Sequence, residues 1–280
     1  MTDRPGPTVR VTARAVRDGG SSTRSDQVAA EEPMEIRVTL PGAAEQSLAI
    51  TMRTPGNDFE LAVGFLATEG VVRTAEDLDA VRYCIGTPVE QQFNIVTVAL
   101  RGSARFDPTR LARNFYTTSS CGVCGKTSLE ALALLDPPPI PEGPVVDPAV
   151  VTSLPEALRA RQRLFERTGG LHAAGLFDAR GDLILVREDV GRHNAVDKLV
   201  GALVLERRYP AGETILAVSG RASFEIMQKA LAAGIPFVAA VGAPSSLAVQ
   251  TAETFGMSLA GFVRDGSFNL YAGAGRVHLS

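Results

Sequence analysis

The spacing of apolar residues in the first half of the chain predicts a hairpin followed by a helix. Residues 35–40 and 47–52 alternate between apolar and polar side chains, which is typical of strands, and turn-forming residues separate them. The apolar residues of 59–66 instead recur with helical spacing, and Asn57 or Asp58 can cap the start of that helix. A sheet with at least one helix packed on it is therefore expected in this half.

Strands and helices alternate more regularly in the second half. Residues 171–178 and 183–187 predict a hairpin. Over the whole chain, the remaining expected helices cover 127–135, 193–207, 224–233 and 245–255. The remaining expected strands cover 93–100, 214–219, 236–241, 258–263 and 268–272. This alternation predicts an α/β fold in which helices pack against a layered sheet.

Composition along the chain suggests four segments. Residues 1–30 contain Gly, Pro, Ser and five arginines without apolar periodicity, so a disordered tail is expected. Residues 136–155 hold seven of the seventeen prolines and predict a linker. It would separate a smaller N-terminal α+β lobe, 31–135, from an α/β lobe, 156–280.

Overall composition excludes several classes of protein. With a net charge of -3 and no apolar run of the ~20 residues that a membrane span needs, neither nucleic acid nor a membrane is an expected partner. The N-terminus lacks the apolar stretch of a secretory signal. Three cysteines cannot form an even disulfide framework, which favours a reducing, cytoplasmic location.

Two of those cysteines, Cys121 and Cys124, lie three positions apart with a glycine after each. Such a pair can bind a metal, form a redox disulfide or carry a sulfur atom. Cys124 directly precedes an expected helix, whose N-terminal amides favour a thiolate, as does the adjacent Lys126. A thiolate here can accept the outer sulfur of a donor persulfide, and the second cysteine can release it or protect the first.

The alternatives carry weaker signals. A single CxxC supplies only two of the four ligands of a structural zinc, and neither His172 nor His193 belongs to a paired-ligand spacing. Zinc deaminases need a glutamate two positions after the histidine, where this chain has Ala174. A thioredoxin-like site is disfavoured because the pair does not follow the first strand of a βαβ unit.

Three further motifs lie at the ends of expected strands. Arg192 and His193 open a helix and suit an anion such as phosphate, with helix capping and exposed ion pairs as the alternative. Residues 218–225 form a candidate phosphate or ligand loop where a strand ends and a helix begins. Asp265 lies in an Asp-Gly turn, yet its carboxylate can accept hydrogen bonds from a guanine edge, and Arg264 can pair with a phosphate.

Taken together, these strings resemble the FdhD family of formate dehydrogenase accessory sulfurtransferases. The matching stretches are MRTPGNDFELAVGFLATEG, RNFYTTSSCGVCGK, TGGLHAAG, REDVGRHNAVDKLVG, SGRASFEIMQKALAAGIP, APSSLAV and GFVRDGSFNLY. The resemblance implies a cytidine-deaminase-like fold, usually as a homodimer. It also implies a protein that takes sulfur from a cysteine desulfurase and passes it to the molybdenum cofactor, as bis(molybdopterin guanine dinucleotide), before insertion into formate dehydrogenase.

The resemblance also assigns residues. Cys121 matches the family's persulfide-forming cysteine, and Cys124 matches its companion, which varies within the family. The family's guanine dinucleotide-binding segment matches six consecutive residues, Phe262, Val263, Arg264, Asp265, Gly266 and Ser267. A guanine nucleotide is therefore expected to mimic the cofactor.

Overall fold

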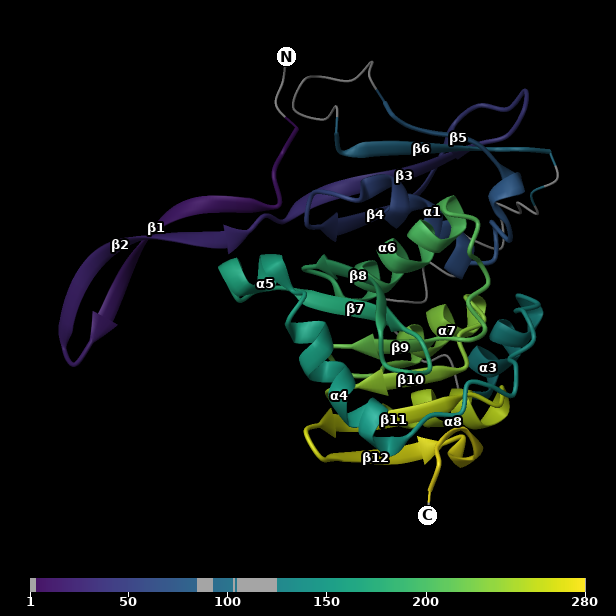
Figure 1. Ribbon diagram of the computed structural model, residues 1–280. Helices are drawn as coiled ribbons and strands as arrows, with labels where there is room; N and C mark the ends of the chain where they lie inside the picture. Colours follow the sequence, from purple (N-terminus) through teal and green to yellow (C-terminus); the bar gives the residue numbers. More distant parts are fainter. Residues whose placement is uncertain (1–3, 85–92, 103, 105–124, 280) are drawn as a thin grey trace.

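The computed structural model describes residues 4–84, 93–102, 104 and 125–279, which form two main sheets with helices between them (Figure 1). The larger sheet has the strand order β12-β11-β10-β9-β7-β8, and the smaller has the order β4-β3-β6-β5. The predicted mixed α/β class and the smaller N-terminal sheet are therefore confirmed. The cytidine-deaminase-like layering stays a prediction.

The larger sheet combines parallel and antiparallel strands. Its members are β7 (His172–Phe177), β8 (Leu183–Asp189), β9 (Ile215–Val218), β10 (Phe237–Ala240), β11 (Ser258–Arg264) and β12 (Ser267–Ala272). β9, β10 and β11 are parallel, whereas β7, β8 and β12 join antiparallel. Parallel neighbours need crossover connections, which α7 (Phe224–Ala232) and α8 (Ser246–Thr254) provide. Each of these elements was predicted, with ends displaced by a few residues.

The smaller sheet precedes it in sequence. It consists of β3 (Glu32–Thr39), β4 (Gln46–Arg53), β5 (Leu78–Tyr83) and β6 (Ile95–Leu100). The helix α1 (Asp58–Thr68) follows β4 as predicted, and the short 3-10 turn η1 (Ala75–Asp77) leads into β5. The expected side-chain cap was wrong: Asn57 is left-handed at φ 57° and caps nothing with its side chain. Asp58 instead accepts a hydrogen bond from the Gly56 amide at 3.1 Å.

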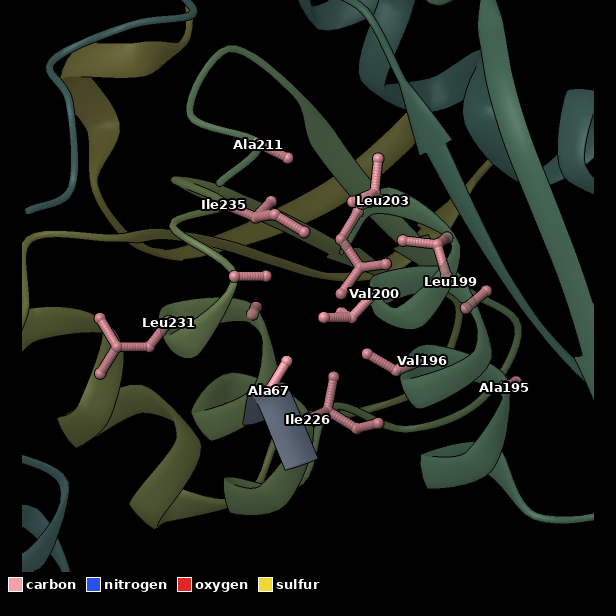
Figure 2. Packing of buried hydrophobic residues seen from close by; sticks show 14 of the residues in the cluster. Ala67, Ala195, Val196, Leu199, Val200, Leu203, Ala211, Ile226, Leu231 and Ile235 are labelled. Carbon is pink, nitrogen blue, oxygen red and sulfur yellow. The ribbon is translucent and has the colours of Figure 1, made fainter. Parts of the chain in front are cut away.

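Two helices form the layer between the sheets. α1 crosses α6 (Arg192–Leu205), and both lie between the two sheets in Figure 1. Their apolar side chains belong to one buried core that also includes residues of both sheets, α7 and α8. Figure 2 shows part of it, with α6 residues such as Val196 and Leu199 near Ala67 and Ile226. Because one core serves both sheets, the predicted lobes pack as a unit.

The opposite face of the larger sheet has its own cover. The helix α4 (Pro148–Arg159) buries Val151, Leu154 and Leu158 against Phe177 and Phe237 of the sheet. Full burial of each such side chain stabilises the fold by roughly 1.5–3 kcal/mol. The larger sheet is therefore packed on both faces, and this packing fixes the positions of its strand ends.

The N-terminal segment is not the disordered tail that composition suggested. β1 (Thr8–Arg17) and β2 (Gly20–Ala29) pair antiparallel and form an arm that projects from the body (Figure 1). Asp18 and Gly19 make the turn, with φ of 50° and 79°. An Asp-Gly pair between two alternating segments is a strong hairpin signal, and it was the signal that a reading by composition missed.

The proline-rich segment also differs from the prediction. Only residues 136–147 connect elements, because α4 begins at Pro148. Asp147 caps that helix by accepting a hydrogen bond from the Ala149 amide at 2.7 Å, and a proline fits the first helical turn. The start of α4 therefore lies inside the segment whose prolines had predicted a linker. The helix α5 (Arg163–Thr168) and the strand β5 were also not predicted.

Three remaining observations complete the fold. The helix α3 (Gly125–Leu134) begins directly after Cys124 in sequence, close to the predicted 127–135. A short 3-10 turn, η3 (Ala274–Arg276), lies near the C-terminus. Within the part of the chain that the structure describes, no helix is both long and apolar enough to span a membrane.

Candidate functional site

The loops that follow the parallel strands lie in a row and are joined by main-chain hydrogen bonds. The amide of Phe262 donates to the Gly242 carbonyl at 3.1 Å, and the amide of Gly242 donates to the Gly220 carbonyl at 2.9 Å. Beyond Gly220, the Ser219 amide donates to the Ala173 carbonyl at 3.0 Å, and the Ser219 hydroxyl accepts from the Ala173 amide at 2.9 Å. We call the line Phe262, Gly242, Gly220 and His172 the strand-end row.

One end of the row is the β11–β12 hairpin with the predicted guanine-binding residues. Phe262 is left-handed at φ 54°, and the residue is 44% exposed although most phenylalanines are buried. A register shift between Gly261 and Arg264 accompanies this conformation. An exposed aromatic ring held by an uncommon backbone conformation is suited to stacking on a planar base.

The rest of the hairpin offers polar groups beside that ring. Arg264, Asp265, Gly266 and Ser267 are exposed, and the Arg264 Nε donates to the Ser267 hydroxyl at 3.1 Å. Val263 differs, since its side chain is 1% exposed and packs in the core under α4. Only the main chain of Val263 can therefore contact a ligand. The assignment of these six residues to a guanine dinucleotide stays a prediction.

The other end of the row brings together polar side chains from three segments that are far apart in sequence. A β-carbon built at Gly220 would lie 3.4 Å from His172 Nδ1 and 4.0 Å from Arg192 Cδ. His193 Nε2 lies 3.3 Å from the Ser223 hydroxyl and 3.7 Å from Glu225 Oε2. The sequence singled out these histidines separately, and the fold places both beside the start of α6.

The surroundings of both histidines favour the neutral imidazole. Burial, together with the positive charge of Arg192, lowers the pKa of His193 to about 4, with Glu225 opposing. The same two causes lower the pKa of His172, whereas the negative charge of Asp189 raises it. The cationic group of this cluster is therefore the guanidinium of Arg192.

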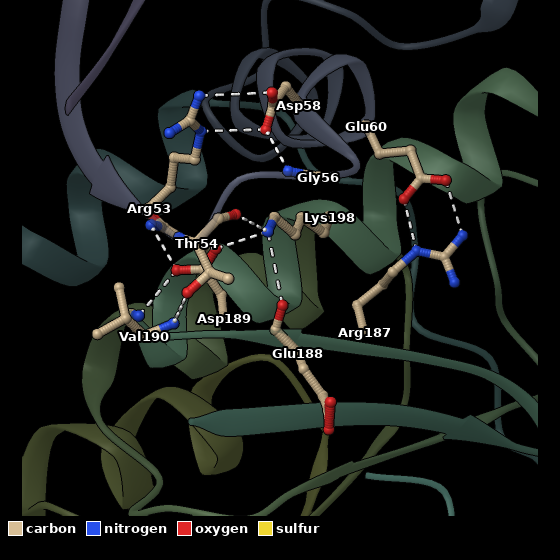
Figure 3. A network of polar contacts seen from close by, with 12 residues as sticks. Arg53, Thr54, Gly56, Asp58, Glu60, Arg187, Glu188, Asp189, Val190 and Lys198 are labelled. Carbon is tan, nitrogen blue, oxygen red and sulfur yellow. Dashed lines mark hydrogen bonds and ion pairs between the residues drawn. The ribbon is translucent and has the colours of Figure 1, made fainter. Parts of the chain in front are cut away.

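A network of buried charges fixes the start of α6 (Figure 3). Asp189 pairs with Lys198 at 2.6 Å and accepts hydrogen bonds from the main-chain amides of Thr54 at 3.1 Å and Gly191 at 2.8 Å. Lys198 also donates to the Thr54 carbonyl at 2.9 Å. The strand-to-helix turn before Arg192 is thereby tied to the N-terminal sheet. The suggestion that the ion pairs of this motif are exposed was wrong for Lys198 and Asp189.

Two further ion pairs, formed by residues of β4, α1 and β8, lie nearby, and sequence reasoning did not identify these pairs. Arg53 is fully buried and pairs with Asp58 at 3.1 Å. Glu60 of α1 binds Arg187 of β8 through two contacts of 2.5 and 2.7 Å. Charged residues interrupt otherwise apolar patterns at these positions, and such interruptions are a sequence signal for buried ion pairs. Glu60 and Arg187 are more than a hundred residues apart in sequence, so local patterns could not show that they pair.

The predicted sulfur-carrying residues Cys121 and Cys124 lie outside the described residues. Their roles therefore rest on sequence. Among the residues that the structure does describe, no three His, Cys, Asp or Glu side chains gather into a metal-binding group. His172 and His193 have no such third ligand within that part of the chain.

The fold and the strand-end row define a two-sheet α/β protein with a candidate ligand-binding row at the ends of parallel strands. A family model described as FdhD/NarQ family matches residues 29–278, and the chain belongs to that family. The match covers every element except the N-terminal arm.

Curated relatives are similar in sequence to this chain over nearly its whole length. The chain is 52% identical over 278 residues to "Sulfur carrier protein FdhD" of Streptomyces coelicolor, covering 96% of this chain and 97% of the relative. It is 48% identical to the protein of the same name from Mycobacterium tuberculosis, covering 91% and 93%, and 43% identical to that from Sulfolobus acidocaldarius, covering 96% and 98%.

A solved structure confirms the fold. The chain resembles the crystal structure of a candidate formate dehydrogenase accessory protein from Desulfotalea psychrophila with a TM-score of 0.73. The likeness covers 96% of this chain and 99% of the other at 23% sequence identity.

Proposed function

We propose that this chain is a sulfurtransferase that supplies formate dehydrogenase with sulfur-loaded molybdenum cofactor. Sulfur arrives from a cysteine desulfurase as a persulfide on Cys121. It then passes to the bis(molybdopterin guanine dinucleotide) cofactor before that cofactor enters the enzyme. The observation that carries the proposal is the near full-length identity of 43–52% to proteins named sulfur carrier.

The sulfur chemistry needs the persulfide of the desulfurase, the two cysteines and a dithiol reductant. The Cys121 thiolate attacks the outer sulfur of the desulfurase persulfide, and the desulfurase cysteine leaves as a thiolate. Cys124 can next attack the inner sulfur of the Cys121 persulfide. This forms a Cys121–Cys124 disulfide and releases the outer sulfur as hydrosulfide, which has gained two electrons. A dithiol reductant then restores both thiols.

The strand-end row supports the cofactor half of the proposal. The cofactor has two guanine dinucleotide arms remote from its metal. The exposed Phe262 ring offers a stacking surface for guanine, and Asp265 offers a carboxylate to its donor edge. Binding energy from a remote arm can position the metal end for sulfur transfer.

A homodimer and a cytoplasmic location complete the proposal. The arm of β1 and β2 leaves Val9 51% and Val28 41% exposed, although these residues are directly paired. An isolated two-stranded hairpin is only marginally stable in water. The arm carries four arginines and two aspartates, whereas the whole chain has a net charge of -3, so its charge complements the body of a second copy. We therefore assign the arm to the dimer contact. The reducing cytoplasm would keep both thiols available.

One experiment tests the central step. The protein is incubated with a cysteine desulfurase and cysteine, and its intact mass and peptides are measured without reductant. We expect one added sulfur on Cys121, removable by a thiol, and none in Cys121→Ala. Cys121→Ala should still bind GDP yet fail to activate formate dehydrogenase. Failure to add sulfur, with GDP binding intact, would instead favour a non-catalytic cofactor chaperone whose cysteines are structural.

A further inference from the structure

We propose that the outer face of the smaller sheet, beside the base of the arm, binds the tip of the arm from a second copy of this chain. The receiving surface, which we call the outer patch, consists of Pro33 of β3 with Ile50 and Met52 of β4. This inference rests on the dimer in the proposed function, and it adds the surface on which the arm docks.

The outer patch is exposed and apolar. Ile50 is 72% and Met52 46% exposed, and Pro33, which pairs with Met52 across the two strands, is also exposed. Successive side chains of a strand point to opposite faces of the sheet. Thr51 points to α6, since its hydroxyl donates to Asn194 Oδ1 at 3.1 Å. Ile50 and Met52 therefore point away from α6, to the face opposite the shared core.

β4 is also an edge strand of its sheet. Within the described part of the chain it pairs with β3 alone, so the other edge of Gln46–Arg53 joins no strand. An edge strand with apolar side chains beside it is a surface on which a further strand can dock. The arm is built of strands, so main-chain hydrogen bonds and apolar contacts can form there together.

The arm has an apolar face that needs a cover. Its apolar side chains gather on one face, which consists of Val9, Val11, Ala13, Ala15 and Val28. The opposite face carries Gln27, which accepts a hydrogen bond from Arg167 of α5 at 3.0 Å. The apolar face therefore points away from α5. A two-stranded hairpin with such a face becomes stable when further structure packs on it.

Two-fold symmetry brings the tip and the outer patch together. In a two-fold dimer the same surfaces meet twice, so two arms that lie side by side run in opposite directions. The tip of each arm then reaches the base of the other. The outer patch lies at that base, because β2 ends at Ala29 and β3 begins at Glu32. The base is fixed by the Ala30 amide, which donates to the Pro7 carbonyl at 2.9 Å.

The arm is large enough for a stable dimer. Each ten-residue strand is about 33 Å long and the two-stranded ribbon is about 10 Å wide, so one face covers about 330 Å². Two arms and the two surfaces that they cover bury about 1,300 Å² in total. Specific protein interfaces bury about 1,200–2,000 Å², so the contact reaches the size that a stable dimer needs.

The tip and the base carry opposite charges. Arg17 ends β1 at the tip, and Glu31 precedes β3 at the base. Both residues are exposed. Complementary charges across an interface favour one register of the two chains and disfavour others. The charges therefore favour the same antiparallel arrangement of the arms as the apolar surfaces do.

Light scattering after size-exclusion chromatography, over a range of protein concentrations, tests the outer patch. Ile50→Ser combined with Met52→Ser should raise the dissociation constant of the dimer about tenfold or more. Leu205→Ser is the control, because Leu205 is 42% exposed at the end of α6 and should leave the dimer unchanged. A folded double variant that dimerises like the wild type would overturn the assignment of the outer patch.

A charge exchange and a cross-link test the register. Arg17→Glu and Glu31→Arg should each weaken the dimer severalfold, and the two together should restore wild-type affinity. Benzoylphenylalanine placed at Ala15 should cross-link on illumination to Gln46–Arg53 of a second copy labelled with nitrogen-15. Cross-links to another part of the second copy, or a charge exchange without recovery, would overturn the arrangement.

The outcomes separate this inference from the proposed function. A dimer that Val9→Ser with Val28→Ser disrupts, but changes at Ile50 and Met52 do not, retains the dimer contact of the arm and overturns only the outer patch. A monomeric wild type overturns both the dimer and this inference. Sulfur loading on Cys121, measured on the same samples, should be unchanged in every variant, so the sulfur-transfer step is tested independently.

Discussion

Gly64 of α1 and Gly201 of α6 face each other where the two helices cross, and neither has room for a β-carbon. A β-carbon on Gly64 would lie 1.8 Å from the Asp197 carbonyl oxygen, and one on Gly201 would lie 1.8 Å from that of Glu60. The two backbones are therefore in direct contact. This crossing sets the distance between the two sheets and the position of α6, whose first residues include Arg192 and His193.

Substitution at this crossing should be strongly destabilising. Gly64→Ala or Gly201→Ala must push the helices apart and disrupt the shared core, which we expect to lower the free energy of unfolding by at least about 3 kcal/mol. Urea denaturation followed by circular dichroism measures the change. Gly275→Ala is the control, because nothing lies within 4 Å of its β-carbon position. Equal stability of Gly64→Ala and Gly275→Ala would refute the tight crossing.

The pair between Lys198 and Asp189 is almost fully buried, with side-chain exposures of 2% and 0%. Lys198→Met leaves the Asp189 carboxylate without its cation and should cost about 3–5 kcal/mol of stability. The double variant Asp189→Asn with Lys198→Met should recover part of this loss, since it removes the unpaired charge. A double variant no more stable than Lys198→Met alone would show that packing, and not charge, dominates at this position.

Stability should fall in mild acid because of His193. Burial and the positive charge of Arg192 lower its pKa from the usual 6.5 to about 4 in the folded protein. Between these values the unfolded chain binds more protons, so stability is complete above about pH 6.5 and declines as the pH falls towards 4. Solvent screening at this half-buried ring limits the effect to roughly 1–2 kcal/mol.

The comparison with His193→Gln isolates that contribution. Urea midpoints measured from pH 7 to pH 4 should fall less steeply in this variant than in the wild type. His278→Gln, which changes an exposed histidine near the C-terminus, should follow the wild type. Parallel curves for wild type and His193→Gln would exclude His193 as the source of the acid dependence.

The exposed arm predicts the oligomeric state. Val9→Ser combined with Val28→Ser makes the paired apolar positions of β1 and β2 polar, and we expect it to convert a dimer into a monomer. Light scattering after size-exclusion chromatography measures the mass. Leu205→Ser is the control, because Leu205 is 42% exposed at the end of α6, away from the arm. A monomeric wild type, or a valine variant that remains dimeric, would contradict the proposed role of the arm.

Local patterns predicted most of the elements but missed the arm, α4, α5 and β5. Apolar spacing identified α1, α6, α7 and α8, because their helical periodicity comes from facing a core. The arm was missed since its composition is polar and its two strands form a sheet of their own within the described part of the chain. α4 was missed because Pro148 and Pro155 resemble linker residues, although a proline in the first turn fits a helix.

The amino-acid sequence by itself determined the α/β class, the family and the cysteine pair, because periodicity and short motifs are properties of neighbouring residues. Only the tertiary structure decided that His172 and Arg192 meet at Gly220, that Asp189 is neutralised by Lys198, and that Gly64 meets Gly201. These contacts depend on strand order and on the crossing of two helices. Contacts of that kind join residues whose separation along the chain leaves no local pattern.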